Sequence, residues 1–225
     1  MSQESFRCTL VSWEEATRLS RVLAARIRSS RFRPHLVIAI GRGGFVPARV
    51  VCDSLLLSNL TSIKVEHWGV AARQMQEARV KYPLPVDVRG LKLLIVDDVT
   101  DTGETLKATM EHVGLQGPQE VRTAVLQHKT CSQFVPDYYA EAITEWRWII
   151  YPWAAHEDLV GFTEKVLAGE ALGVPEIRAG LERRYSLQVS EKTLAGVLAE
   201  LMEMGRLVKV DGLYSLVSGP EKPPI

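Results

Sequence analysis

The sequence is poor in cysteine. Its 225 residues contain three cysteines, Cys8, Cys52 and Cys131, and none has a partner at metal-ligand spacing. A sparse, odd set argues against a disulfide framework and favours a reducing compartment, the cytoplasm.

Long apolar runs and an excess of charge are also lacking. No stretch approaches the roughly 20 apolar residues that cross a bilayer, and the first residues lack the apolar core of a signal peptide. Lys+Arg and Asp+Glu both number 27, so nothing supports a chain-wide basic surface for nucleic acid. We therefore expect a cytoplasmic protein with no membrane partner.

The first two thirds of the chain alternate between apolar runs and amphipathic segments. Residues 36–40 are apolar without interruption, which is typical of a strand buried on both faces. Residues 13–29 repeat apolar side chains at helical spacing behind a capping Ser12. Further strands are predicted at 62–67, 91–96, 120–127, 138–142 and 146–151, and further helices after Gly44 and over 103–113. The alternation predicts an α/β domain over residues 1–155, with a mostly parallel sheet flanked by helices.

The pattern changes after Trp153. Helices are predicted over 157–168, 175–185 and 190–205, followed by a hairpin whose strands are 206–210 and 213–216. Three helices and a hairpin are the order of a winged helix-turn-helix. We therefore divide this part into a connecting helix (156–168), a small winged-helix-like domain (169–219) and a tail (220–225).

The segment Leu94–Leu106 carries the strongest chemical signal. A buried strand ends in Asp97 and Asp98, a loop rich in hydroxyls and glycine follows, and a helix begins. Amides at a helix N-terminus, with the hydroxyls of Thr102 and Thr105, form a cradle for an anion. The two carboxylates suit ribose hydroxyls and a nearby Mg²⁺. Together these groups fit a sugar phosphate.

This segment resembles the signature of the type I phosphoribosyltransferases, in which an apolar strand and two acids precede a Thr-Gly-x-Thr loop. The resemblance implies an Mg²⁺-dependent enzyme that binds 5-phosphoribosyl-1-pyrophosphate (PRPP). Asp97 and Asp98 would hold the ribose hydroxyls, and the Mg²⁺ would arrive with PRPP, with these two acids as possible further ligands. The 5′-phosphate would bind at Thr102, Gly103, Glu104 and Thr105.

Two more segments acquire roles from the resemblance. The turn containing Arg42, Gly43 and Gly44 would bind pyrophosphate, because glycines let backbone amides reach the anion and the arginine adds positive charge. Residues 69–89 are polar and show no periodicity, so they predict a long loop. The family keeps a mobile catalytic loop there, which excludes water.

The expected acceptor is a 6-oxopurine, because that branch of the family resembles this chain in having Asp before Thr-Gly. Asp101 would be the general base that takes the proton from purine N7, although capping the next helix is an alternative role for it. Lys129 would read O6.

The aromatic segment Trp146–Trp153 resembles the purine-stacking segment of xanthine–guanine enzymes. Trp148 would stack on the base and the backbone of Ile149 would meet its exocyclic edge, whereas Trp146 and Trp153 are explained by packing. The family usually has an acid where this chain has Ala154, so the preference among hypoxanthine, guanine and xanthine is open. Glu157 or Asp158 could replace that acid.

Several functions remain open at this stage. The favoured one is purine salvage, with PRPP and a base as substrates and a nucleoside monophosphate as product, in a homodimer or higher homo-oligomer. The others are a PRPP-sensing DNA-binding transcription regulator, a bifunctional protein, and an orotate or adenine enzyme. The C-terminal domain would bind DNA or serve as a dimerisation module, and the third helix begins with Glu191 and Lys192 rather than with a basic cluster.

Overall fold

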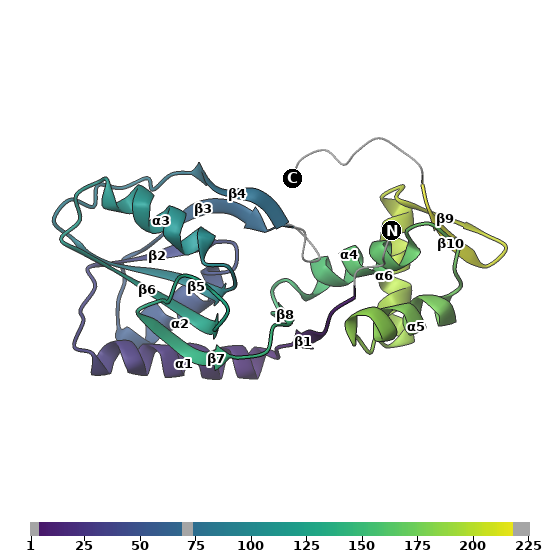
Figure 1. The fold of residues 1–225 in the computed structure, drawn as a ribbon, viewed down its shortest axis with the longest axis horizontal. Helices are drawn as coiled ribbons and strands as arrows, with labels where there is room; N and C mark the ends of the chain where they lie inside the picture. The colour runs from purple at the N-terminus through teal and green to yellow at the C-terminus, as the bar shows by residue number, and fades with distance from the viewer. Residues whose placement is uncertain (1–4, 69–73, 218–225) are drawn as a thin grey trace. The chain divides into compact units, whose positions relative to one another are not determined.

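The structure, a computed structural model, describes residues 5–68 and 74–217. It confirms the α/β class and the mostly parallel sheet (Figure 1). The described residues divide into two compact units, and the division is not a single cut at residue 155. One unit holds residues 11–146 and 151–153, and the other combines the residues up to Leu10 with 147–150 and those from Ala154 onward.

The larger unit is built on a six-stranded sheet of order β4-β3-β2-β5-β6-β7. Its strands are β2 (Leu36–Gly41), β3 (Leu60–Trp68), β4 (Gln74–Tyr82), β5 (Lys92–Thr100), β6 (Glu120–Lys129) and β7 (Tyr138–Ile143). All neighbours are parallel except β3 and β4. Helices α1 (Trp13–Ser29) and α2 (Phe45–Leu55) pack on one face, and α3 (Glu104–Gly114) packs on the other.

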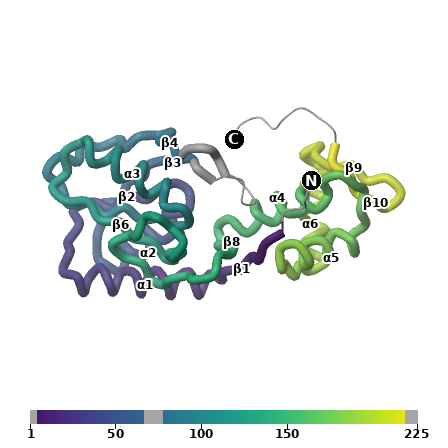
Figure 2. Tube along the Cα trace, viewed as in Figure 1, coloured from purple at the N-terminus to yellow at the C-terminus, as the bar shows by residue number. Residues whose placement is uncertain are grey.

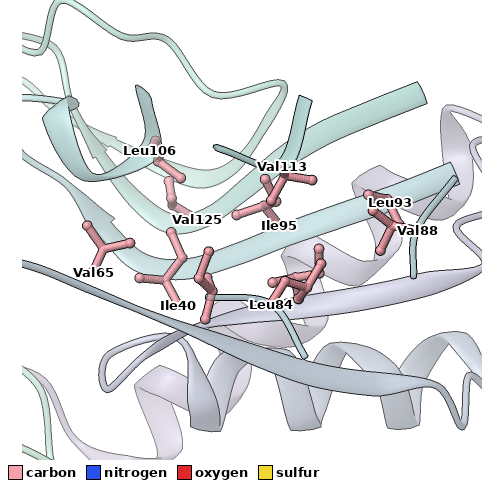
Figure 3. Packing of buried hydrophobic residues seen from close by; sticks show 11 residues of the cluster. Ile40, Val65, Leu84, Val88, Leu93, Ile95, Leu106, Val113 and Val125 are labelled. Carbon is pink, nitrogen blue, oxygen red and sulfur yellow. The ribbon is translucent and has the colours of Figure 1, made fainter. Parts of the chain in front are cut away.

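The buried hydrophobic side chains of the central strands form the core between the sheet and α3. Ile38 and Ile40 of β2, Ile95 of β5 and Val125 of β6 meet Leu106 of α3 in one cluster (Figure 3). These strands are apolar on both faces because helices cover both sides of a parallel sheet. Burial of this kind stabilises a fold by about 25 cal/mol for each Å² of apolar surface removed from water.

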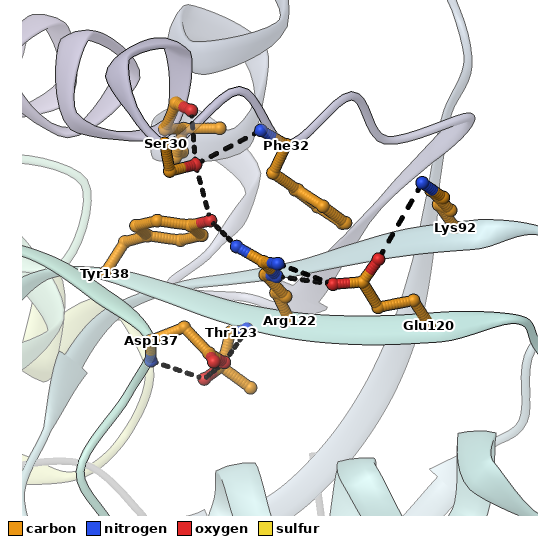
Figure 4. A network of polar contacts seen from close by, with 9 residues as sticks. Ser30, Phe32, Lys92, Glu120, Arg122, Thr123, Asp137 and Tyr138 are labelled. Carbon is orange, nitrogen blue, oxygen red and sulfur yellow. Dashed lines mark hydrogen bonds and ion pairs between the residues drawn. The ribbon is translucent and has the colours of Figure 1, made fainter.

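A polar network connects the end of α1 to the first residues of β6 and β7. This end of the sheet is opposite to the predicted ligand-binding loops. Ser30, just after α1, is 2.7 Å from the hydroxyl of Tyr138, which also accepts a hydrogen bond from Arg122 (Figure 4). Arg122 also donates to Glu120. The network satisfies the polar ends of side chains whose apolar parts pack under α1, so it fixes the helix on the sheet.

Strand β4 corrects the prediction of one long loop over residues 69–89. Residues 74–82 pair antiparallel with β3 at the edge of the sheet. An edge strand tolerates polar side chains, and its hydrogen bonds come from the neighbouring strand, so the residues themselves give little strand signal. Residues 69–73 of the predicted loop lie outside the described residues.

The smaller unit contains α4 (Ala155–Leu167), α5 (Val174–Tyr185), α6 (Glu191–Glu203) and the hairpin β9 (Leu207–Val210) and β10 (Leu213–Leu216). Leu172 pairs with Tyr214, so a short third segment joins the hairpin. The three predicted helices and the hairpin are confirmed as elements. The tail from residue 218 lies outside the described residues.

The N-terminal segment completes this smaller unit. Strand β1 (Cys8–Leu10), which the sequence did not predict, pairs parallel with β8 (Trp148–Ile150) (Figure 2). The ring of Phe6 lies 5.9 Å from that of Phe162 and 5.2 Å from that of Tyr185. Phe6 therefore belongs to the same hydrophobic core as α4 and α5.

The start of α6 does not carry the basic cluster that DNA binding needs, since its first two residues are Glu191 and Lys192. At the start of α6, Glu191 accepts a hydrogen bond from Arg178, and the outer face of the hairpin exposes Val208, Val210 and Leu213. Phosphate contacts depend on Lys and Arg. DNA binding therefore stays a prediction from element order alone. In the described part of the chain, no helix is both long and apolar enough to span a membrane.

Candidate active site

The candidate site lies where the order of the sheet reverses direction. From β2 the chain adds β3 and β4 on one side, and from β5 it adds β6 and β7 on the other. Ligands of open parallel sheets bind at the carboxyl ends of the strands on either side of such a switch point. In this protein, β2 ends at Gly41 and the residues 42–44 follow it, and Asp97 and Asp98 lie near the end of β5. The structure therefore brings the two predicted loops to one edge.

The glycines of the first loop allow the backbone to approach its neighbours closely. A Cβ on Gly44 would lie 2.2 Å from the carbonyl oxygen of Val96 and 2.8 Å from the amide nitrogen of Ile40. A Cβ on Gly43 would lie 2.5 Å from a carboxylate oxygen of Asp98. The peptide bond between Gly41 and Arg42 is cis. The predicted pyrophosphate loop and the predicted ribose carboxylate are thus in direct contact.

Burial dominates the electrostatics of the two adjacent carboxylates. It raises the pKa of Asp97 well above its usual range, and the charge of Asp98 raises it further. Burial also raises the pKa of Asp98 from 3.8 to about 6, against the hydrogen bonds from Trp153 and the backbone, which lower it. Two neighbouring acids that ionise with difficulty favour a ligand that brings hydroxyl donors or a cation.

Two aromatic residues hold Asp98 in place. The indole nitrogen of Trp153 donates to Oδ2 of Asp98 over 3.1 Å, and the ring of Trp153 stacks on Tyr151 with centroids 4.9 Å apart. The hydroxyl of Tyr151 donates to Gln127 over 2.8 Å and lies 3.1 Å from the carbonyl oxygen of Asp98. Reading Trp153 as packing was therefore incomplete, because the sequence does not tell where the polar atom of an aromatic side chain points.

The predicted phosphate loop is shaped by Gly103. This residue occupies the N-cap position of α3 with a φ of 91°, which lies in the left-handed region that favours glycine. A Cβ there would lie 2.4 Å from the Cβ of Phe134. Thr102 accepts a long hydrogen bond, 3.4 Å, from the amide of Glu104. Thr102, Gly103, Glu104 and Thr105 thus lie together at the N-terminus of α3, where an anion is favoured.

Asp101 does not cap α3, so the alternative role considered from the sequence is wrong. Its Oδ2 accepts from Nζ of Lys129 over 2.7 Å, and its Oδ1 accepts from the indole nitrogen of Trp146 over 3.0 Å. Nζ of Lys129 also lies 4.6 Å from the centroid of the Trp146 ring. The structure joins the predicted general base to the predicted O6-reading lysine. It adds Trp146, which the sequence analysis had explained by packing.

The other two predicted purine-binding residues lie in the smaller unit. Trp148 and Ile149 belong to β8, next to β1, and Ile149 is buried. The indole nitrogen of Trp148 donates to Oδ2 of Asp158 over 2.9 Å. Asp158 is buried, and its Oδ2 already accepts this hydrogen bond. To replace the acid that is missing at Ala154, Asp158 would have to give up this contact. The structure does not unite Trp148 and Ile149 with Asp101 in one unit.

The carboxylates do not form a metal cage by themselves. Among the residues that the structure describes, no group of three or more His, Cys, Asp or Glu side chains could hold a metal ion. Asp97 and Asp98 supply oxygen ligands of the kind Mg²⁺ prefers. The donor set is therefore incomplete without oxygens from a ligand.

The raised pKa of Asp98 predicts how stability depends on pH. The folded chain keeps a proton on Asp98 that the unfolded chain releases above about pH 4, so stability is lost as the pH rises towards 6. Asp98→Asn should remove this loss. In urea unfolding of the ligand-free protein, we expect the variant to gain on the order of 1–3 kcal/mol over the parent at pH 7, and little at pH 3.5. Asp53→Asn, on the exposed face of α2, is the control. An equal gain at both pH values would show that ionisation of Asp98 is not the cause.

Comparison with known proteins agrees with this geometry. Residues 9–158 match the family described as phosphoribosyl transferase domain, and the chain belongs to that family. The xanthine-guanine phosphoribosyltransferase of Idiomarina loihiensis is 30% identical over 157 residues, which are 69% of this chain and 92% of the relative. That of Ruegeria sp. is 31% identical over 153 residues, 64% of this chain and 83% of the relative.

A solved structure gives the same relationship. The purine phosphoribosyltransferase from Pyrococcus horikoshii is 30% identical, with a TM-score of 0.56, over 65% of this chain and 93% of that one. The Helicobacter pylori xanthine-guanine-hypoxanthine phosphoribosyltransferase, at 20% identity and a TM-score of 0.56, shares the fold. The family match ends at residue 158, so α5, α6 and the hairpin lie beyond it.

Proposed function

We propose that this protein transfers the 5-phosphoribosyl group of PRPP to a 6-oxopurine base, releasing pyrophosphate and forming a nucleoside monophosphate. The observation that carries the proposal is the ion pair between Asp101 and Lys129, whose Oδ2 and Nζ are 2.7 Å apart. Asp101 lies three residues after Asp98 in the chain. A carboxylate and an ammonium at one place suit a base with a proton to give at N7 and an acceptor at C6. The names of the relatives support purine salvage and do not favour a transcription regulator.

The reaction uses each predicted group once. Purine N9 attacks the anomeric carbon of PRPP, the bond from that carbon to the pyrophosphate oxygen breaks, and the proton on N7 passes to Asp101. Lys129 stabilises the negative charge that develops at O6. Asp97 and Asp98 hold the ribose, the start of α3 holds the 5′-phosphate, and the loop at Arg42 receives the pyrophosphate. Mg²⁺, bound through PRPP, would neutralise part of the charge on the leaving group.

Trp148 and Ile149 keep their proposed role as the stacking platform and the backbone contact of the base. Because Ala154 replaces the usual acid, we expect guanine to gain less over hypoxanthine than in relatives that keep that acid. The smaller unit is proposed to be a winged helix, which the pairing of Leu172 with Tyr214 beside the hairpin supports. Homo-oligomerisation is also proposed.

A panel of bases tests the function directly. Hypoxanthine, guanine, xanthine, adenine and orotate are each incubated with PRPP and Mg²⁺, and pyrophosphate release is measured. We expect turnover of the 6-oxopurines and none of adenine, because Lys129 donates and cannot pair with an amino group at C6. Lys129→Ala should slow the reaction and weaken the discrimination against adenine.

Lys192→Ala, an exposed lysine of α6, is the matched control and should behave as the parent protein does. A preference for adenine in the parent protein would contradict the assignment. If the protein binds PRPP but releases no pyrophosphate with any of the five bases, the result would instead favour the regulator.

A further inference from the structure

The two groups that should read the purine are covered in the ligand-free protein. The side chain of Lys129 is 2% exposed and that of Asp101 is 10% exposed. A base can bond to them only at hydrogen-bond distance, roughly 2.7–3.2 Å between heavy atoms. Whatever covers this pair must therefore move before a base can bind.

Trp146 contacts both members of the pair. Its indole nitrogen donates to Oδ1 of Asp101, and its ring lies against Nζ of Lys129. Its other side is open, because the residue is 44% exposed. Cation and ring attract each other when the ammonium lies within about 6 Å of the ring centroid, so the contact also stabilises the covered state.

The position of Trp146 in the chain allows this movement. It lies between β7, which ends at Ile143, and β8, which begins at Trp148, and it belongs to neither strand. The side chain can therefore leave the pair without breaking a ladder hydrogen bond of the sheet. Its departure frees Oδ1 of Asp101 from the indole hydrogen bond and takes the ring away from the ammonium of Lys129.

We propose that Trp146 covers the base site and competes with the purine for Asp101 and Lys129, until the base replaces its contacts. The inference rests on the proposed function. A 6-oxopurine restores both interactions, since its N7–H donates to Asp101 in place of the indole, and its O6 accepts from Lys129. Adenine restores only the first. The cost of displacing Trp146 is the same for every base, so the ring weakens the binding of all of them, and the discrimination against adenine comes from Lys129.

Two variants separate the parts of this contact. Trp146→Phe keeps a ring over Lys129 and loses the N–H donor, and Trp146→Ala loses both. Because a hydrogen bond to a charged group is lost from the covered state alone, the KM for hypoxanthine should fall about tenfold in Trp146→Phe. The kcat should stay within about twofold of the parent value. In Trp146→Ala, the KM values for hypoxanthine and for guanine should fall by at least the same factor, and the ratio between them should stay as in the parent, because the displacement cost is common to both bases. Tyr82→Phe, at an exposed aromatic residue of β4 with a lysine near its ring, is the control for loss of a polar group from an aromatic side chain and should change neither KM nor kcat.

Movement of the side chain can be observed without turnover. The chain has five tryptophans, so protein labelled with 5-fluorotryptophan gives five ¹⁹F resonances, and Trp146→Phe identifies the one from Trp146. Adding 9-deazahypoxanthine with PRPP and Mg²⁺ should shift that resonance towards the position of a solvent-exposed indole, because this analogue keeps the N7–H and O6 but has a carbon in place of the attacking N9.

The outcomes separate the two proposals. If the parent protein transfers no base, the proposed function fails. If it transfers hypoxanthine while Trp146→Phe has an unchanged or higher KM, or the resonance stays in place with 9-deazahypoxanthine bound, Trp146 has only a structural role and the inference is overturned. Should Trp146→Ala not fold, the conservative Phe variant and the resonance still decide.

Discussion

Asp101→Asn is expected to lower kcat by a factor on the order of 10²–10⁴, the usual contribution of a general base. An amide keeps an oxygen that can accept from Trp146, but it cannot take the proton from purine N7. The KM for PRPP should change little, because Asp97, Asp98 and the loop at the start of α3 remain. Steady-state pyrophosphate release with hypoxanthine measures both constants.

Stability must be measured in the same variant. Lys129 is buried against Asp101, and removing one partner of a buried ion pair usually costs about 3–5 kcal/mol. The kinetics therefore have to be taken where urea unfolding shows the variant to be folded. Asp53→Asn, an exposed carboxylate of α2, provides the matched control. Parent-like kcat in a folded Asp101→Asn across the pH range would remove the catalytic role and leave a structural ion pair.

The second large effect is expected from Gly44→Ala. The added Cβ would lie 2.2 Å from the carbonyl oxygen of Val96 and 2.8 Å from the amide of Ile40, and both are backbone atoms of central strands. Neither can shift without disturbing the pairing of β2 with β5. We expect a loss of about 3 kcal/mol in stability, at the upper end for overpacking, and at least a tenfold higher KM for PRPP, since the loop at Arg42 must move.

Gly114→Ala is the control, because a Cβ at the end of α3 would meet no atom within 4 Å. Urea unfolding and PRPP kinetics on both variants provide the measurement. If Gly44→Ala matched Gly114→Ala in stability and in KM, the close approach of the loop to β5 would have no bearing on PRPP binding.

The regular elements of the larger unit were predictable because their signals are local. The uninterrupted apolar run at Leu36–Ile40 reflects a strand that is buried on both faces, as β2 is in the structure. The helical spacing over residues 13–29 reflects a helix that is buried on one face, as α1 is. The motif that ends β5 also lies within one short segment. For that reason the family, the fold class and the switch-point loops could be predicted together.

The elements that were missed depend on a distant partner. Strand β4 is polar and lies at an edge, and its pairing with β3 creates it. Strand β1 has three residues, too few to show a period, and is a strand because β8 lies beside it. Residues 5–10 join α4 and α5 for the same reason, which explains why a single boundary at residue 155 does not describe the two units.

The sequence by itself determined which chemical groups this protein has: two acids after a buried strand, a glycine loop, a Thr-Gly-x-Thr turn, an aspartate and a lysine. Only the tertiary structure decided which of them meet. Asp101 and Lys129 are 28 residues apart, and Asp101 and Trp146 are 45 apart. They meet because β5, β6 and β7 are successive parallel neighbours, which puts the ends of all three strands at one edge of the sheet. Hydrogen bonds between side chains follow distance in space, and a linear pattern of residues does not contain that distance.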